Sequence, residues 1–341
     1  MKKYFNYIVL FLSILYLFSC TSNSERDMYF LKGKEELLKQ NYEAAYHYFT
    51  ECLKKDSLLN DAQNNRGVAL FAMLRYREAI NDYSAVIERD SFFMDAYYNR
   101  ANAYFELKKY DSALQDLDKL AKMLPDSAYV FFNRGTVLLA LKEYDKAISD
   151  FNKVVENQPS NLEALANKGT ALFYQSQYAE AKKLFEQILA QKADFHYAIN
   201  NLGLIESIQG NYQKAIEYYE KAIKHSPAHP FYLNNRGFAY LQIGELEKAE
   251  EDLKTSLFYD SKNSLALRNM GVCQLSLNKP QQALNFLNKA MEIDPNTELL
   301  YFHLAETYYA LNEIQEACQM WEKHRTQGNL GKTLPFVEKC K

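Results

Sequence analysis

The stretch that decides the fold is residues 64–83, NNRGVALFAMLRYREAINDY, because its pattern returns twice at a spacing of 34 residues. Residues 98–117 read YNRANAYFELKKYDSALQDL, and residues 132–151 read FNRGTVLLALKEYDKAISDF. In each copy a small residue is followed by an alanine and then by a large apolar residue, always at the same distances. A fixed period without insertions indicates a chain built from structural repeats.

The same three columns continue through most of the 341-residue chain. The alanine column contains Ala45, Ala79, Ala113, Ala147, Ala181, Ala215, Ala249, Ala283 and Ala317. The small column contains Gly33, Gly67, Ala101, Gly135, Gly169, Gly203, Gly237, Gly271 and Ala305. The large column contains Phe49, Tyr83, Leu117, Phe151, Phe185, Tyr219, Leu253, Leu287 and Trp321. Nine repeats without a break in register are therefore expected.

Each repeat reads as two amphipathic helices joined by a turn. We expect the small residues at the crossing of the two helices, where only glycine or alanine lets the backbones approach closely. The large residue of the second helix then fills the space beside that crossing. Six repeats open the second helix with tyrosine, and Pro280 is compatible with a helix's first turn.

This period and column pattern resembles the tetratricopeptide repeat family. The resemblance implies an all-α fold, a right-handed superhelical solenoid of nine helix-turn-helix repeats whose first helices line a concave face. The expected units are residues 26–59, 60–93, 94–127, 128–161, 162–195, 196–229, 230–263, 264–297 and 298–331. Residues 332–341 are too short for another hairpin and are expected to form a partial C-terminal cap.

The N-terminus carries a targeting signal, with two lysines before an apolar run that is short for a transmembrane helix. The run ends at Cys20 and resembles a bacterial lipoprotein signal peptide. The resemblance implies a signal over residues 1–19, a lipidated Cys20 and a polar tether over residues 20–25, with no aspartate after Cys20 to oppose an outer-membrane location. The alternative is an ordinary signal peptide or an uncleaved anchor in which Cys20 is incidental.

Two further columns vary together and predict a structural lock within each hairpin. Arginine precedes the small residue in four repeats, and only those four have aspartate sixteen residues later. The pairs are Arg66 with Asp82, Arg100 with Asp116, Arg134 with Asp150, and Arg236 with Asp252. The other five repeats contain mostly apolar residues in the second column, so we expect the two positions to face each other.

A ladder of asparagines is the best candidate for a binding site. Asparagine is a poor residue for a helix interior, because its side chain competes with the backbone for hydrogen bonds. Seven consecutive repeats nevertheless place it two residues before the small column, at Asn65, Asn99, Asn133, Asn167, Asn201, Asn235 and Asn269. Side-chain amides both donate and accept, so a concave ladder could hold a peptide backbone of any sequence. The alternative is that asparagine is simply common in this chain and caps contacts between adjacent repeats.

Aromatic residues accompany the ladder at positions that face the groove in the family. They are Tyr98, Phe105, Tyr129, Phe132, Tyr174, Phe231 and Phe238. Such rings are good anchors for a partner, although each could instead belong to the core between repeats. Arg268 is an isolated cation in the groove, without the neighbouring lysines by which the family's carboxylate clamp binds acidic tails.

No catalytic, cofactor-binding or metal-binding arrangement is predicted. His225 and His229 flank Pro227 and read as a turn rather than a metal site. Residues 331–333 lack the glycine-rich strand turn of a phosphate loop. A net charge of −3 without a basic stripe argues against nucleic acid as a partner. Cys318 and Cys340 could pair in an oxidising periplasm, but the sequence does not require it.

These features predict a non-enzymatic, lipid-anchored scaffold that holds peptide segments or partner proteins of a cell-envelope assembly in its concave groove. The expected location is the outer membrane, facing the periplasm or the cell surface. Two alternatives stay open. One is a surface lipoprotein that binds glycans for nutrient uptake, and the other is a structural brace that uses the convex face.

Overall fold

The computed structural model describes residues 24–327 and 334–340. Within these residues the secondary structure is helical throughout, without a strand, so the expected all-α fold is confirmed. In the same residues, no helix combines the length and the apolar character that crossing a membrane requires. Cys20 and the expected signal peptide and tether up to residue 23 lie outside the described residues.

The helices alternate with the period of the sequence. A helix over residues 24–38 comes first. The later first helices are α3 (Asn60–Ala72), α5 (Met94–Glu106), α7 (Ala128–Ala140), α9 (Leu162–Tyr174), α11 (His196–Ile208), α13 (Pro230–Gln242), α15 (Ser264–Ser276) and α17 (Leu300–Ala310). The second helices are α2 (Tyr42–Lys55), α4 (Tyr76–Arg89), α6 (Tyr110–Met123), α8 (Tyr144–Asn157), α10 (Tyr178–Gln191), α12 (Tyr212–His225), α14 (Leu246–Tyr259), α16 (Pro280–Ile293) and α18 (Ile314–Thr326).

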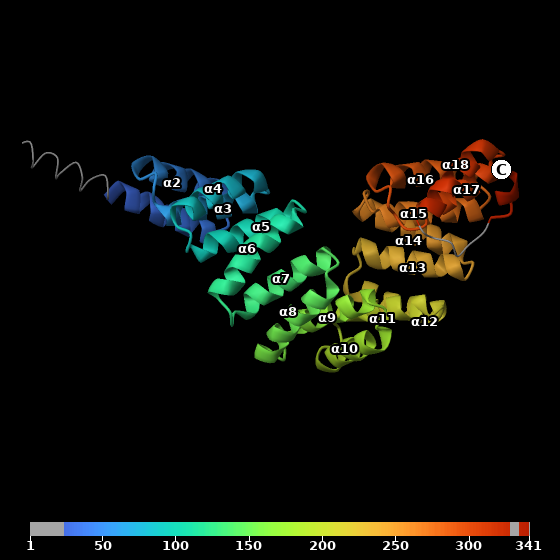
Figure 1. Ribbon diagram of the computed structural model, residues 1–341, viewed down its shortest axis with the longest axis horizontal. Coiled ribbons are helices and arrows are strands. Elements are labelled where there is room, and N and C mark those ends of the chain that lie inside the picture. The colour runs from blue at the N-terminus through green and yellow to red at the C-terminus, as the bar shows by residue number, and fades with distance from the viewer. Residues whose placement is uncertain (1–23, 328–333, 341) are drawn as a thin grey trace, which may run out of the picture. The chain divides into compact units, whose positions relative to one another are not determined.

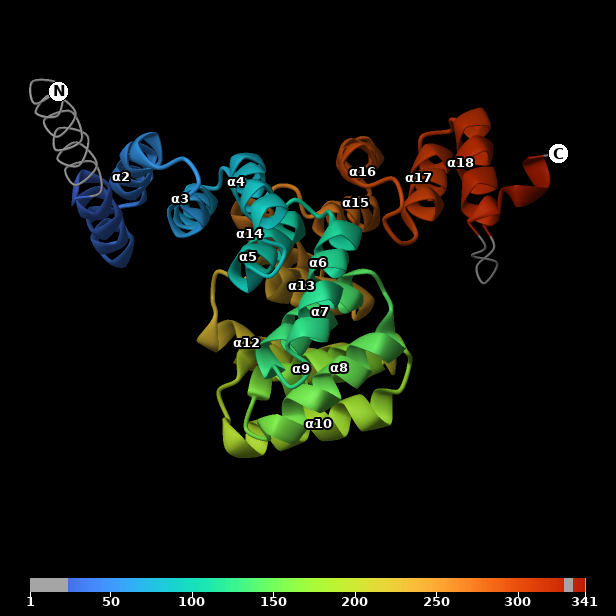
Figure 2. The ribbon, with the colours of Figure 1, turned by 60° about the vertical axis from the view of Figure 1, so that its left-hand side comes forward.

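The chain divides into two compact units, residues 1–171 and residues 172–341, with the boundary inside α9. In the first unit α3 packs on α4, α5 on α6, and α7 on α8, and each pair also contacts the next. In the second unit the pairs α11–α12, α13–α14, α15–α16 and α17–α18 follow the same rule. The last pair lies side by side in both ribbon views (Figures 1 and 2).

The three sequence columns form the contact inside each hairpin. All nine residues of the alanine column are fully buried, and the large column is almost as deeply buried. A Cβ atom added to Gly135 would lie 2.8 Å from Cε1 of Phe151, too close for any real contact. A Cβ atom added to Gly271 would likewise lie 2.6 Å from Cγ of Leu287. The size of each small residue is thus limited by the side chain that faces it.

Every hairpin turns in the same way. The nine residues with positive φ at these turns follow the 34-residue period and are Gln40, Leu74, Lys108, Lys142, Ser176, Gly210, Gly244, Asn278 and Asn312. After each one, the next backbone N–H donates to the carbonyl five residues earlier, as from Arg75 to Leu70 at 2.9 Å. This is a Schellman motif, which closes the first helix and directs the chain into the second.

The four arginine–aspartate pairs are joined by two hydrogen bonds each. Arg100 donates from Nε and Nη2 to the two carboxylate oxygens of Asp116 at 2.8 and 2.7 Å. Arg66, Arg134 and Arg236 bind their aspartates with the same geometry. Burial raises the pKa of the Asp116 carboxyl despite the two donors from Arg100. Desolvation therefore offsets much of what the charge pair contributes.

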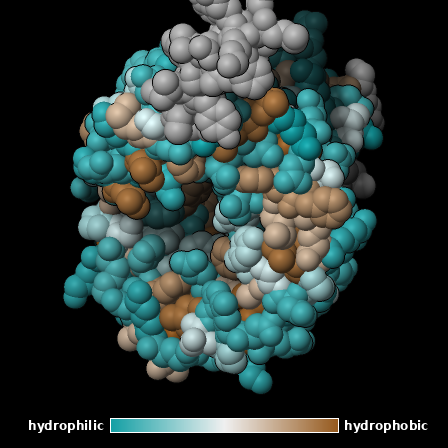
Figure 3. All heavy atoms as spheres, turned by 90° about the vertical axis from the view of Figure 1, so that its left-hand side faces the viewer, coloured by the Kyte–Doolittle hydropathy of each residue, from teal (hydrophilic) through white to brown (hydrophobic). Residues whose placement is uncertain are grey.

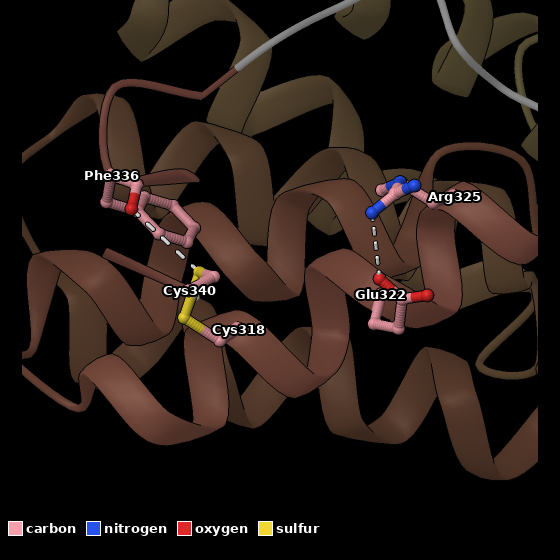
Figure 4. Close-up of a disulfide and its surroundings, with 5 residues drawn as sticks. All are labelled: Cys318, Glu322, Arg325, Phe336 and Cys340. Carbon is pink, nitrogen blue, oxygen red and sulfur yellow. Dashed lines mark hydrogen bonds and ion pairs between the residues drawn. A yellow bond between two sulfur atoms is a disulfide. The ribbon is translucent and has the colours of Figure 1, made fainter. Parts of the chain in front are cut away.

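A short C-terminal segment covers the last hairpin. Leu334 and Phe336 are buried, and the Phe336 ring stacks on Tyr309 with centroids 4.6 Å apart. The segment ends in a 3₁₀ turn, η1 (Val337–Lys339), and a disulfide joins Cys340 to Cys318 of α18 (Figure 4). The free thiols among the described residues, Cys52 and Cys273, are buried in the core.

The charge pairs generate a prediction about stability. Arg100→Met leaves the buried Asp116 carboxylate without its partner and should lower the free energy of unfolding by about 3–5 kcal/mol. Combining it with Asp116→Phe removes both charges and should restore most of that loss, because the second change also removes the desolvation cost. Urea unfolding followed by circular dichroism measures both variants. Equal losses in the single and double variants would contradict the pairing.

Candidate functional site

The best-formed site lies on the first helices of the second unit. There α13 contacts both α11 and α15, and α15 contacts α17, so the four first helices form one continuous face. The second helices pack behind them as their hairpin partners. The face therefore presents one helix from each of four successive repeats to a ligand.

Two adjoining hollows follow this face and form what we call the Arg268 groove. One has a volume of about 410 Å³ and reaches Leu204 and Ile208 of α11. The other has a volume of about 220 Å³ and reaches His303 of α17. The residues shared by both hollows are Tyr212, Phe238, Arg268, Asn269 and Glu298. The groove thus continues on both sides of Arg268.

Asparagine side chains link the repeats beneath this groove. Asn269 donates from Nδ2 to Oδ1 of Asn234 at 2.9 Å, and Asn235 donates in the same way to Asn200 at 3.0 Å. In the first unit Asn99 donates to Asn64 at 3.1 Å. Each of these bonds runs from a ladder asparagine to the residue before the ladder position in the preceding repeat. This arrangement fixes neighbouring first helices in register.

Arg268 occupies the position at which other repeats have the accepting asparagine. Only 7% of its surface is exposed, and no described residue forms a hydrogen bond or ion pair with it. Burial lowers the pKa of its guanidinium, and the nearby Glu298 carboxylate counteracts this effect. A buried cation without a partner is costly, so Arg268 differs in kind from the four paired arginines.

Asn269 offers the complementary group in the same groove. Its Nδ2 donates a hydrogen bond to Asn234, while its Oδ1 is buried and has no hydrogen-bond partner among the described residues. The side chain is 2% exposed. Two adjacent residues of α15 therefore present an unsatisfied cationic donor and an unsatisfied acceptor. A buried polar group in this condition favours a ligand that completes its hydrogen bonds.

The other ladder asparagines have different surroundings. Asn133 and Asn201 donate to the carbonyl oxygens of Tyr129 and Tyr197 in their own helices, at 2.7 and 2.8 Å. Asn65 and Asn167 are half-buried on α3 and α9. Three ladder asparagines, Asn99, Asn235 and Asn269, therefore form hydrogen bonds between adjacent repeats. Within the described part of the chain, the structure gives no such bond for the other four.

The seven aromatic candidates also separate into groups. Phe238 lines the Arg268 groove. Tyr129, Tyr174 and Phe231 are exposed. Tyr98, Phe105 and Phe132 are half-buried and pack against the hydrophobic cores of the first unit. For these three the structure places the rings in the packing between helices rather than in an open groove.

Exposed hydrophobic residues also occur outside the Arg268 groove. Figure 3 shows one face, on which brown patches are small and separated by hydrophilic residues. Large apolar side chains with high exposure, such as Leu58, Phe92 and Phe258, occur at different repeats. Dispersed residues of this kind are normal for a protein surface.

Sequence reasoning missed the accepting asparagines of the inter-repeat bonds. Asn64, Asn200 and Asn234 each stand directly before a ladder asparagine, so an Asn-Asn pair marks all three. This Asn-Asn pair is the sequence signal by which the accepting asparagines could have been found. Among the described residues, no cluster of three or more histidine, cysteine, aspartate or glutamate side chains could hold a metal ion.

Family models described as tetratricopeptide repeat match most of the array. One model matches residues 64–128, 101–161 and 167–230, another residues 218–251, and a third residues 266–297. The chain therefore belongs to the tetratricopeptide repeat family. This repeat commonly mediates protein–protein interaction, and proteins of this scaffold family are typically non-enzymatic. No curated protein matches the chain.

Solved structures of other proteins also match parts of this chain. A chain of the APC/C hetero-tetramer Cut9-Hcn1 matches with a TM-score of 0.60 and 15% identity, over 78% of this chain and 52% of that one. A tetratricopeptide repeat protein from Parabacteroides merdae matches with a TM-score of 0.48 and 18% identity, over 83% and 99%. MamA matches with 0.47 and 21%, over 50% and 93%.

The contrast between arginines generates a second prediction. Arg268→Met should raise the stability of the second unit by about 1 kcal/mol or more, because methionine fills the site without an unsatisfied charge. Arg236→Met should instead lower stability by about 3–5 kcal/mol, since it leaves Asp252 unpaired. Urea unfolding followed by circular dichroism compares the two. A loss in Arg268→Met as large as that in Arg236→Met would show that Arg268 supports the fold.

Proposed function

We propose that this protein is a non-enzymatic scaffold, anchored by a lipid at Cys20, that holds an extended segment of a partner protein of a cell-envelope assembly. The face formed by the first helices is the binding surface. The observation that carries the proposal is the Arg268 groove, in which buried polar groups of α15 lack partners within the described chain.

The position of these groups supports a peptide ligand. Asn269 and Arg268 lie beside apolar and aromatic residues such as Phe238 and Leu204, so one surface offers both hydrogen bonds and hydrophobic contact. A ligand pocket of this composition fixes orientation by a few polar groups and gains affinity from apolar burial. An extended segment can meet both requirements along one groove.

The disulfide supports a location outside the cytosol. Cys318 and Cys340 are joined, and such bonds persist mainly in oxidising compartments such as the periplasm. The lipoprotein-like N-terminal sequence favours the same compartment. A cysteine carrying several acyl chains would hold the protein firmly at a membrane surface, because each buried methylene contributes about 0.8 kcal/mol.

Capture of partners from a solubilised cell envelope tests the binding surface. One bait is the lipid-free chain starting at residue 21, and the other combines Leu204→Ala, Ile208→Ala and Phe238→Ala, three residues that line the Arg268 groove. These replacements keep Arg268 and the hydrogen bonds from Asn235 and Asn269 that join adjacent repeats. We expect mass spectrometry to identify a discrete partner that the triple variant loses at least about tenfold, because the apolar surface that it removes contributes roughly 25 cal/mol per Å² of contact.

A matched control removes the same chemistry from the second helices. Phe258→Ala, Tyr259→Ala and Ile293→Ala remove exposed apolar side chains from α14 and α16, and this variant should retain the partner. Circular dichroism confirms that all baits keep their helicity. A partner retained by both triple variants would move binding to the second-helix side or the ends, as expected for a brace.

Metabolic labelling with a fatty acid tests the anchor separately. The wild-type chain, expressed in a Gram-negative bacterium, should incorporate label and sediment with outer membranes. Cys20→Ala removes the acceptor thiol and should abolish labelling. Label retained by Cys20→Ala, or absent from the wild type, would contradict lipidation at this cysteine while leaving the binding surface untouched.

A further inference from the structure

The hydrogen-bonded asparagine relay ends at Arg268. In the preceding steps an asparagine before the ladder accepts from the next repeat's ladder residue, as Asn234 does from Asn269. At the following step the accepting position holds Arg268, and the next ladder position holds His303, whose Nδ1 bonds to Glu306 at 2.8 Å. Arginine has no acceptor, so it cannot continue the relay. The side chain is left in the groove with donors and no described partner.

We propose that Arg268 and Asn269 form a subsite for an acidic residue within an extended partner segment. The carboxylate of an aspartate or glutamate accepts from the Arg268 guanidinium, while a backbone N–H of the same segment donates to Oδ1 of Asn269. This inference rests on the proposed peptide-binding function and specifies what the groove selects. It does not need the lysines of a carboxylate clamp, because the two buried residues of α15 supply both the donor and the acceptor.

The pairing of a donor with an acceptor identifies a peptide rather than a simple anion. A free carboxylate ion would satisfy Arg268 but has no hydrogen-bond donor for Asn269. A peptide supplies both groups, since every non-proline residue carries a backbone N–H. Charge-assisted hydrogen bonds to a buried guanidinium are also stronger than those between neutral groups.

The continuity of the groove favours an internal acidic residue over a free C-terminus. Leu204 and Ile208 lie on one side of Arg268, and His303 lies on the other. A chain that crosses Arg268 can therefore continue in both directions. The apolar lining at α11 favours a hydrophobic residue near the acidic one, where burial would add affinity.

Glu298 modulates the same subsite. It borders both hollows and lies close enough to act electrostatically on Arg268, yet it is exposed and forms no ion pair with it among the described residues. A bound carboxylate would meet repulsion from Glu298. Removing that charge should therefore strengthen binding, which is the opposite of the effect expected from removing Arg268.

Selection from a displayed library of random peptides tests the subsite directly. The wild-type chain should enrich peptides with one internal aspartate or glutamate beside a hydrophobic residue, and Arg268→Met should not enrich the acidic residue. A selected peptide is then synthesised with a capped C-terminus. Its affinity, measured by fluorescence anisotropy, should fall at least about thirty-fold with Arg268→Met or with replacement of its acidic residue by the amide. Glu298→Gln should raise the affinity.

Controls separate this inference from the general function. Arg325→Met removes an exposed arginine of α18 outside the groove and should bind like the wild type. Peptides that bind through the ladder but show no acidic preference would overturn the subsite and leave peptide binding standing. Failure to enrich any peptide would overturn both. Affinity that depends only on an uncapped C-terminus, or competition only by a uronic-acid polymer, would replace the proposed ligand and overturn the inference.

Discussion

The close crossing of two helices is the constraint on which the rest of this structure depends. Nine alanines are fully buried at that contact, and the glycine or alanine that faces the large residue has little room to grow. A hairpin held this closely buries one face of each helix but leaves another apolar face open. Neighbouring hairpins cover that face, so packing proceeds from each repeat to the next. First helices are then placed together, which creates the groove.

The buried arginines of this molecule are of two kinds, those paired with an aspartate and Arg268. Four arginines form an ion pair with an aspartate of their own hairpin, where attraction between the charges opposes the cost of desolvation. Arg268 has no such aspartate. Phe286 stands in the aspartate column of its repeat, and Arg268 lies two residues before Met270, which occupies the arginine column. The first arrangement specifies how a hairpin closes. The second leaves interaction energy available to a ligand, a common property of binding residues that destabilise the free protein.

The repeat pattern was sufficient to predict the all-α fold, since a period of 34 with small and large columns leaves few other ways to pack. The second helices begin at the same position of each repeat, as α2 does at Tyr42 and α4 at Tyr76. The first helix α17 instead begins at Leu300, because Leu299 before it adopts a left-handed conformation. Such a local adjustment has no periodic signal. The candidate site was harder to predict, because an asparagine column cannot reveal which amides bind one another. Whether Phe132 packs inward or outward likewise depends on neighbours that a single column does not specify.

The turns between helices separate the control of stability from the control of binding. Seven of the nine positive-φ positions carry a residue with a side chain, although glycine adopts this conformation without steric cost. Each such residue costs about 1 kcal/mol relative to glycine. The turn is therefore specified by its hydrogen bonds and by the packing of the two helices rather than by the residue within it. Changes at these positions can raise or lower the robustness of single repeats in small steps while the first-helix surface that meets a ligand keeps its chemistry.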